Sequence, residues 1–202
     1  MNYHWNWHIF LEPAPNGTGA YLDMLLSGLV LTLETAICAW ALALLFGSIV
    51  GVLRTLPSKT AGRIGFGYVE FFRNMPLLVQ LFLWFFVLPE ILPRSWGLWM
   101  KQMSNAPFWT AAIGVGLFMS ARVAEQLRAG IHSLPRGQGL AATALGLTTL
   151  QKYRYVLLPM AFRIILPPLT SEFLNTIKNT SVAITIGLIE LTGEARAMQE
   201  FS

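Results

Sequence analysis

Residues 134–159 read LPRGQGLAATALGLTTLQKYRYVLLP, and hydrophobic segments flank this stretch on both sides. The stretch is basic, rich in glycine and too polar to cross a bilayer. Its spacing predicts a short helix, a turn at Gly146 and a second short helix that ends at Pro159, because glycine adopts the left-handed conformation that ends a helix and proline breaks one. We therefore expect a polar helical hairpin between membrane spans, on the side where a membrane protein meets a cytoplasmic partner.

The rest of the chain has the composition of an integral membrane protein. Of its 202 residues, 54% are hydrophobic and 12% are charged, whereas a soluble domain carries about 25% charged residues. The net charge is +4, but the basic residues lie mostly at the ends of apolar runs, where they set topology. Motifs of nucleic-acid binding are absent from the sequence. The fold class expected is all-α and polytopic, with membrane lipid and not nucleic acid as its surroundings.

Membrane-length segments can be placed at approximately residues 24–53, 64–89, 108–129 and 160–190, four spans in all. The loop 54–63 contains Arg54, Lys59 and Arg63, so the positive-inside rule places it in the cytoplasm and the amino terminus outside. Gly47 and Gly51 in the first span form a small-xxx-small pair, which lets another helix approach closely.

The second span is expected to be bent or broken at Pro76, after a short amphipathic helix, because proline removes a hydrogen-bond donor and biases the preceding residue away from helix. Arg73 and Asn74 come directly before this break. One interpretation is that they flank a translocation path. The alternative is that Glu70 and Arg73 form an i, i+3 pair at the cytoplasmic interface.

The last membrane-length segment is the most polar. Pro167 and Pro168 are expected to interrupt it early, and a set of polar side chains follows them: Glu172, Asn175, Lys178 and Asn179. Ionisable groups inside a span indicate a substrate or ion path, although interhelical hydrogen bonds that hold a bundle together are the alternative. In the third span, Arg122, Glu125 and Arg128 are expected to anchor the helix end and to pair at i, i+3.

The hairpin carries a long, spaced motif. Its residues Leu140-Ala141-Ala142, Gly146 and Val156-x-Leu158-Pro159 match the pattern E-A-A-x3-G-x9-I-x-L-P, which is that of the permease loop of ATP-binding-cassette (ABC) importers. The stretches VEFFRNMPLLVQ (69–80), ARVAEQLRAGIHSLPRGQ (121–138) and LPPLTSEFLNTIKNTSVAITIG (166–187) agree. Over essentially its whole length, the chain resembles permease subunits of polar amino-acid ABC importers. Together with WNWHIFL (5–11) near the start, it looks most like the glutamate/aspartate branch.

The resemblance implies that residues 1–202 form a single permease domain with the type I importer fold, in the bacterial cytoplasmic (inner) membrane. It implies that the hairpin docks into a groove of an ATPase, with Ala141, Ala142 and Leu145 as a face of close approach. The implied partners are a second permease, identical or homologous, two ATPase subunits and an external amino-acid-binding protein. ATP and Mg²⁺ are then used by the ATPase, and no cofactor binds this subunit.

The sequence itself shows no Walker A pattern, no nucleophile with a positioned base and no metal-ligand cluster. We therefore expect a transporter subunit and not an enzyme. Because an acidic amino acid is negatively charged, cationic side chains should line its route, and Arg73 and Lys178 are the candidates.

Two departures from the family pattern qualify this reading. Leu140 stands where the family has glutamate, so one contact with the ATPase is expected to be missing. The chain also ends before the fifth span expected in this branch, which indicates a truncated or natively short subunit. The alternative function is a non-transporting membrane anchor or regulatory subunit that retains the docking hairpin.

Overall fold

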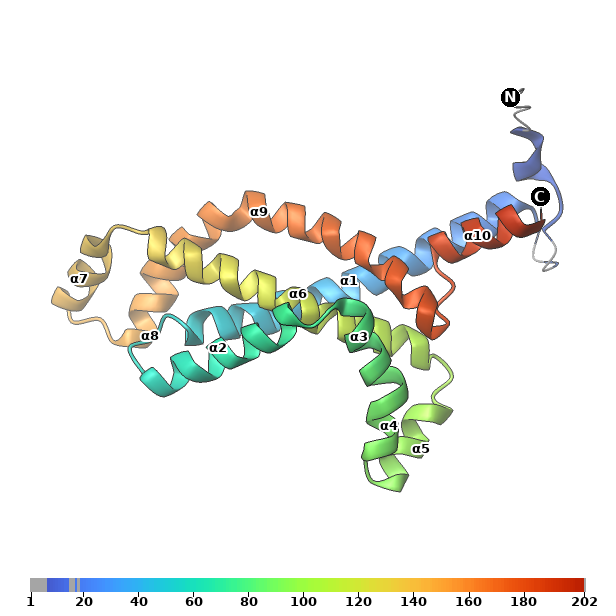
Figure 1. Cartoon of the computed structure of the whole chain (residues 1–202). Helices are drawn as coiled ribbons and strands as arrows, with labels where there is room; N and C mark the ends of the chain where they lie inside the picture. The colour runs from blue at the N-terminus through green and yellow to red at the C-terminus, as the bar shows by residue number, and fades with distance from the viewer. Residues whose placement is uncertain (1–6, 15–16, 18, 202) are drawn as a thin grey trace.

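The computed structural model describes residues 7–14, 17 and 19–201, and these residues form helices joined by short turns (Figure 1). The helical segments, in chain order, are η1 Trp7–Leu11, α1 Tyr21–Leu53, α2 Lys59–Asn74, α3 Leu77–Phe82, η2 Leu83–Val87, α4 Leu88–Ile91, α5 Arg94–Gln102, α6 Ala106–Ser133, α7 Arg136–Ala144, α8 Thr149–Lys152, η3 Tyr153–Leu157, α9 Leu158–Asn179, η4 Thr180–Ile186 and α10 Leu191–Phe201. Within the described residues, β pairing is limited to one isolated bridge between Pro13 and Ala20.

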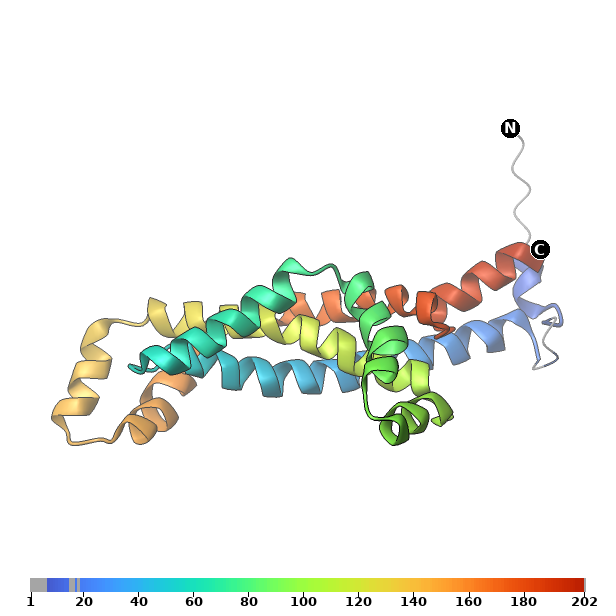
Figure 2. The ribbon, with the colours of Figure 1, turned by 60° about the horizontal axis from the view of Figure 1, so that its bottom comes forward.

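The bundle is elongated, and α1, α6 and α9 run along its length (Figures 1 and 2). The short helices α7 and α8 lie at one end, whereas η1 and α10 lie at the other. Among the described residues, three helical stretches are long and apolar enough to cross a membrane: Tyr21–Leu53, Ala106–Ser133 and Thr149–Ile186. A fourth span is present if the bent pair Lys59–Asn74 and Leu77–Ile91 counts as one. The predicted all-α polytopic architecture is therefore confirmed.

Small residues form the contact between α1 and α6. Ala39, Ala43, Gly47 and Gly51 follow one another at i, i+4 along α1 and are all buried. A Cβ atom on Gly47 would lie 2.6 Å from Val123 Cβ and 2.7 Å from the Ser120 carbonyl oxygen of α6. The predicted close approach at the small-xxx-small pair is thus confirmed, and the two backbones meet along much of their length.

The second span is broken at Pro76, as the sequence predicts. Helix α2 ends at Asn74, α3 begins at Leu77, and the two segments meet at an angle of 101°. The buried side-chain amide of Gln80 donates to the Phe72 and Met75 carbonyls, both at 2.9 Å. It thereby satisfies acceptors that the break removes from the helical ladder. Beyond the break, α4 and α5 form a hairpin that projects from the side of the bundle (Figure 2).

Helix α2 also begins earlier than the sequence interpretation allows. The loop was expected to extend to Arg63, but the helix begins at Lys59. The reason is a cap: Ser58 Oγ accepts from the Ala61 amide at 3.4 Å, which satisfies one free donor of the first turn.

The prediction that the second hairpin helix ends at Pro159 is wrong. Helix α8 continues through η3, a π-helical turn, into α9, and the Leu158 amide donates to the carbonyl five residues earlier, at Tyr153. This wide turn places Pro159 in the first turn of α9, where a missing amide costs little. A π turn also precedes Pro89. There, η2 leads into α4, and the Leu88 amide donates to the Leu83 carbonyl.

Pro167 and Pro168 do not interrupt the last span either, since both lie inside the continuous helix α9. Their side chains are exposed. In membrane helices the carbonyl groups that a proline frees are satisfied by local adjustment and by neighbouring groups, so proline is tolerated there. The expectation that these prolines interrupt the helix is therefore wrong for this segment.

Substitution of Gly47 tests the α1–α6 contact. We expect Gly47→Val to destabilise the chain by roughly 1–3 kcal/mol, because the new side chain overpacks the contact with Val123 and Ser120. The matched control is Gly67→Val on α2, where a Cβ atom has nothing within 4 Å. Thermal unfolding in detergent should show a lower midpoint for the first variant and little change for the second. Equal effects would contradict the packing described.

Candidate functional site

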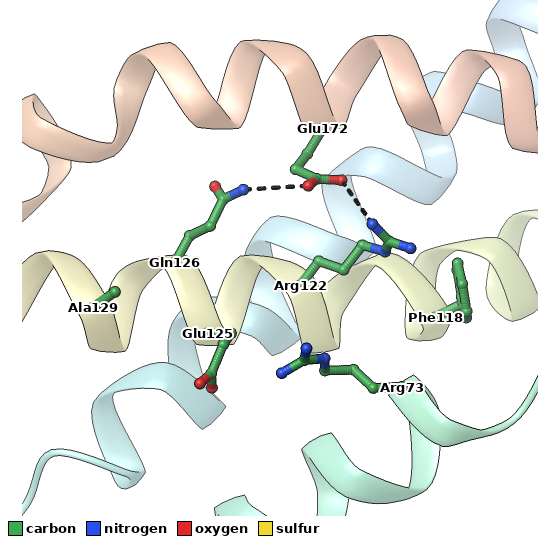
Figure 3. A pocket seen from close by; sticks show the side chains of 7 residues that line it. All are labelled: Arg73, Phe118, Arg122, Glu125, Gln126, Ala129 and Glu172. Atoms are coloured by element: carbon green, nitrogen blue, oxygen red, sulfur yellow. Dashed lines mark hydrogen bonds and ion pairs between the residues drawn. The ribbon is translucent and has the colours of Figure 1, made fainter.

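A cavity of about 420 Å³ lies between α2, α6 and α9 (Figure 3). The residues that line it are Arg73, Phe118, Arg122, Glu125, Gln126, Ala129 and Glu172. Five of them come from one face of α6, because positions 118, 122, 125, 126 and 129 repeat at helical spacing. Arg73 enters from the last turn of α2, just before the break, and Glu172 enters from α9.

On one wall of the cavity, three polar side chains meet the carboxylate of Glu172. Arg122 Nη1 lies 3.8 Å from Glu172 Oε2, and Gln126 Nε2 donates to Oε1 at 3.4 Å (Figure 3). Asn175 Nδ2 donates to Oε2, also at 3.4 Å. The Glu172 side chain is 15% exposed and that of Arg122 is 46% exposed. The Arg122 guanidinium is therefore accessible from the cavity, although it pairs with Glu172. It also lies over the Phe118 ring.

The opposite carboxylate, Glu125, is held by two arginines. Arg54, at the end of α1, pairs with Glu125 Oε2, and Arg128 Nη2 lies 2.8 Å from Oε1. Neither of these two arginines lines the cavity, whose own charged residues are Arg73, Arg122, Glu125 and Glu172. The formal charges of the lining therefore balance, and because Glu125 is already paired with Arg54 and Arg128, Arg73 and Arg122 are the cationic groups that face the cavity and suit an anionic ligand.

The structure separates the predicted path residues into two groups. Arg73 and Glu172 line the cavity, and Asn175 is bonded to Glu172. Asn179 instead lies with Nδ2 3.4 Å from Met119 Sδ of α6. Lys178 is exposed on α9 and is not among the residues that line the cavity.

The residues before Pro76 follow neither interpretation fully. Asn74 Nδ2 donates to Glu70 Oε2 at 2.8 Å, so the i, i+4 partner of Glu70 is an amide. The ion pairs of the described residues do not include Glu70 with Arg73. The Arg73 side chain extends towards the cavity instead (Figure 3).

Arg122, Gln126 and Phe118 are cavity residues that the sequence interpretation missed. It paired Arg122, Glu125 and Arg128 within one helix end, and only the Glu125–Arg128 pair is present. Arg122 reaches across to α9 because its partner, Glu172, faces it there. The signal available in the sequence was the helical spacing of these side chains on one face of a membrane-length segment.

The hairpin at the end of the bundle is a second candidate site. Gly146 has φ = +76°, the left-handed conformation predicted for it. The Gly146 amide donates to the Thr143 carbonyl at 3.0 Å and the Leu147 amide to the Ala142 carbonyl at 3.1 Å, which is the bonding of a Schellman motif. Thr148 and Gln151 then cap α8 reciprocally. The turn is thus fixed by hydrogen bonds at both of its ends.

The exposed side of this hairpin differs from the face that the motif suggested. Ala142 is only 3% exposed and packs inside the hairpin, so it is not available to a partner in this arrangement. Ala141 is exposed, and three leucines stand out further, Leu140, Leu145 and Leu150, with Leu145 at 81% exposure. Of the remaining motif residues, Val156 and Leu158 are half-buried and Pro159 is exposed. The hairpin thus leaves three large apolar side chains exposed, each available to a partner.

The family described as "Binding-protein-dependent transport system inner membrane component" matches residues 22–202. The chain belongs to this family. It is therefore a component of a transport system and not an enzyme, and its membrane-length helices agree with a multi-pass protein of the inner membrane.

Individual relatives support the predicted resemblance. The chain is 48% identical over 205 residues to the glutamate/aspartate import permease protein GltJ of Escherichia coli (strain K12), covering 100% of this chain and 83% of the relative. It is 31% identical to the glutamate/aspartate import permease protein GltK of Escherichia coli O6:H1, over 89% of this chain and 79% of the relative. The crystal structure of an amino acid ABC transporter with histidines aligns with a TM-score of 0.73 and 32% identity, covering 89% of this chain and 79% of that chain.

Proposed function

We propose that this chain is the membrane-spanning permease subunit of an ATP-driven importer that carries acidic amino acids, glutamate and aspartate, into the cytoplasm. The observation that carries the proposal is the cavity within the bundle, with Arg73 and Arg122 on its walls and with Glu125 already paired with Arg54 and Arg128. Guanidinium groups bind carboxylates with charge-assisted hydrogen bonds, and a dicarboxylic amino acid offers two carboxylates to two arginines. The names of the relatives GltJ and GltK support the same substrate class.

The partners in this proposal are a second permease, two ATPase subunits and an external binding protein. Support for the second permease comes from the exposed guanidinium groups of Arg73 and Arg122. A charge that faces lipid within a membrane span is costly, so the face that carries these two arginines is expected to meet protein or a water-filled path. Identical or homologous permeases both satisfy this requirement.

In this proposal, the hairpin transmits the movement of the ATPase subunits to the membrane helices. We place the hairpin in the cytoplasm and the amino terminus outside, since basic residues follow the first span. ATP and Mg²⁺ bind to the partner ATPases, and closure of those subunits draws two hairpins together. The attached helices then pass between inward-open and outward-open arrangements. Leu140, Leu145 and Leu150 supply apolar contact to the ATPase in place of the missing carboxylate at position 140.

Arg122→Gln tests the substrate class. The change removes the guanidinium and keeps a hydrogen-bonding side chain, so glutamate loses a charge-assisted hydrogen bond worth about 1.5–3 kcal/mol. Because each 1.4 kcal/mol is about tenfold, uptake of glutamate at limiting concentration should fall about tenfold or more. Glutamine uptake, if any is measurable, should fall less. Arg163→Gln is the matched control, since Arg163 is an exposed arginine of α9 outside the cavity lining. Equal glutamate uptake in wild type and Arg122→Gln would contradict the proposal.

Leu145→Asp tests the docking role of the hairpin. Because Leu145 is exposed, its replacement by aspartate leaves the new carboxylate in water and the fold undisturbed. Ala142→Asp would instead bury a charge inside the hairpin. We expect Leu145→Asp to abolish copurification with the ATPase and to leave the thermal midpoint of the chain unchanged.

Thr60→Asp serves as the control, because Thr60 is exposed in the first turn of α2, where a carboxylate is favourable. It should copurify with the ATPase as wild type does. If Leu145→Asp still binds the ATPase and supports transport, the hairpin is not the docking element. If the wild-type assembly binds the ATPase but carries no amino acid, a non-transporting anchor becomes the better assignment.

A further inference from the structure

Arg54 is the residue that caps the carboxyl end of α1, and three helices determine where its side chain lies. Its guanidinium pairs with Glu125 of α6 and lies 5.8 Å from the centre of the Phe66 ring of α2. Its stem passes so close to Gly65 that a Cβ atom there would lie 2.6 Å from Arg54 Cγ. The side chain is only 11% exposed. Because Glu125 lines the charged cavity, the end of α1 is fixed relative to that cavity.

The next residue, Thr55, is fixed to the hairpin. The Tyr153 hydroxyl donates to the Thr55 carbonyl at 2.6 Å and lies 3.1 Å from Thr55 Oγ1. The Thr55 amide and hydroxyl both donate to the Val52 carbonyl at 2.9 Å, which closes the turn and sets the direction of the Thr55 carbonyl. Tyr153 is buried and is the first residue of the π turn η3. The contact thus meets the hairpin where α8 joins the last span.

Two adjacent residues after α1, which we call the corner Arg54–Thr55, therefore make polar contacts in two directions: Arg54 with Glu125 of the cavity and Thr55 with Tyr153 of the hairpin. We infer that the corner Arg54–Thr55 couples movement of the hairpin to the cavity, with the Tyr153 hydroxyl as the positioning group. When the hairpin moves, it either carries the corner with it or breaks the hydrogen bonds at Thr55. In the first case Arg54 shifts Glu125, and the cavity wall changes with it. This role in transport rests on the function proposed above, whereas the physical link does not.

The hydroxyl can be tested apart from the packing around it. Val52 and Leu56, on either side of the end of α1, belong to the same apolar cluster as Tyr153, Leu157 and Leu158, and this packing does not need the hydroxyl. Tyr153→Phe keeps the ring and removes both hydroxyl contacts. Tyr155→Phe is the matched control, because it removes the same group from the same turn, where the side chain is 65% exposed.

The first experiment measures the link in the full chain alone, by hydrogen exchange in lipid nanodiscs. Glu125→Gln weakens the hold on Arg54, so exchange of the amides of residues 149–158 should rise about threefold, which is within the range known for coupled sites. In a Tyr153→Phe background, Glu125→Gln should change those amides far less, whereas a Tyr155→Phe background should retain the effect. An equal effect of Glu125→Gln in all three backgrounds overturns the inference.

The second experiment measures amino acid carried per ATP hydrolysed in the reconstituted assembly. Tyr153→Phe should lower this ratio about threefold or more, and Tyr155→Phe should leave it at the wild-type value. If transport and hydrolysis fall together at a constant ratio, Tyr153 has only a structural role and the inference is wrong. A wild-type assembly that hydrolyses ATP without transport contradicts the proposed function instead, and the exchange experiment still decides whether the link exists.

Discussion

The close contact between α1 and α6 is the constraint on which the rest of the molecule depends. Glycine and alanine at i, i+4 let the two backbones approach until a Cβ atom at Gly47 or Gly116 would collide with the opposite helix. Without a hydrophobic effect between helices in lipid, such packing is a main source of association. The contact turns one face of α6 towards α9 and sets the end of α1 beside Glu125. The cavity and the corner at Arg54 both follow from that placement.

Local chemistry determined which parts of the fold the sequence could predict. The break at Pro76 and the left-handed turn at Gly146 were predictable, because each depends on one residue whose backbone conformation is restricted or unusually free. Pro159 misled the interpretation for a physical reason. A π turn before a Leu-Pro pair lets the helix continue, and it occurs at both Pro89 and Pro159.

The cavity was predictable only in part, because its walls come from three helices. Arg73 and Glu172 were found, since a charge within a membrane-length segment calls for a partner or a path. Arg122 was missed because sequence spacing shows the i, i+3 neighbours of a side chain and not its neighbours on another helix. Lys178 lies six residues after Glu172, and on a helix that separation is a rotation of about 240°, which places it outside the cavity that Glu172 lines. The role of these residues in transport remains a prediction.

A rigid α1–α6 frame can be tested by a distance between spin labels in the assembled transporter. One label replaces Leu45 on α1 and the other replaces His132 on α6, both exposed, in a chain whose lone cysteine is removed by Cys38→Ala. Double electron–electron resonance should give one narrow distance distribution that is the same with and without bound nucleotide. A distribution that shifts or splits when nucleotide binds would show that α1 and α6 move apart, and it would contradict the frame on which the cavity and the hairpin link depend.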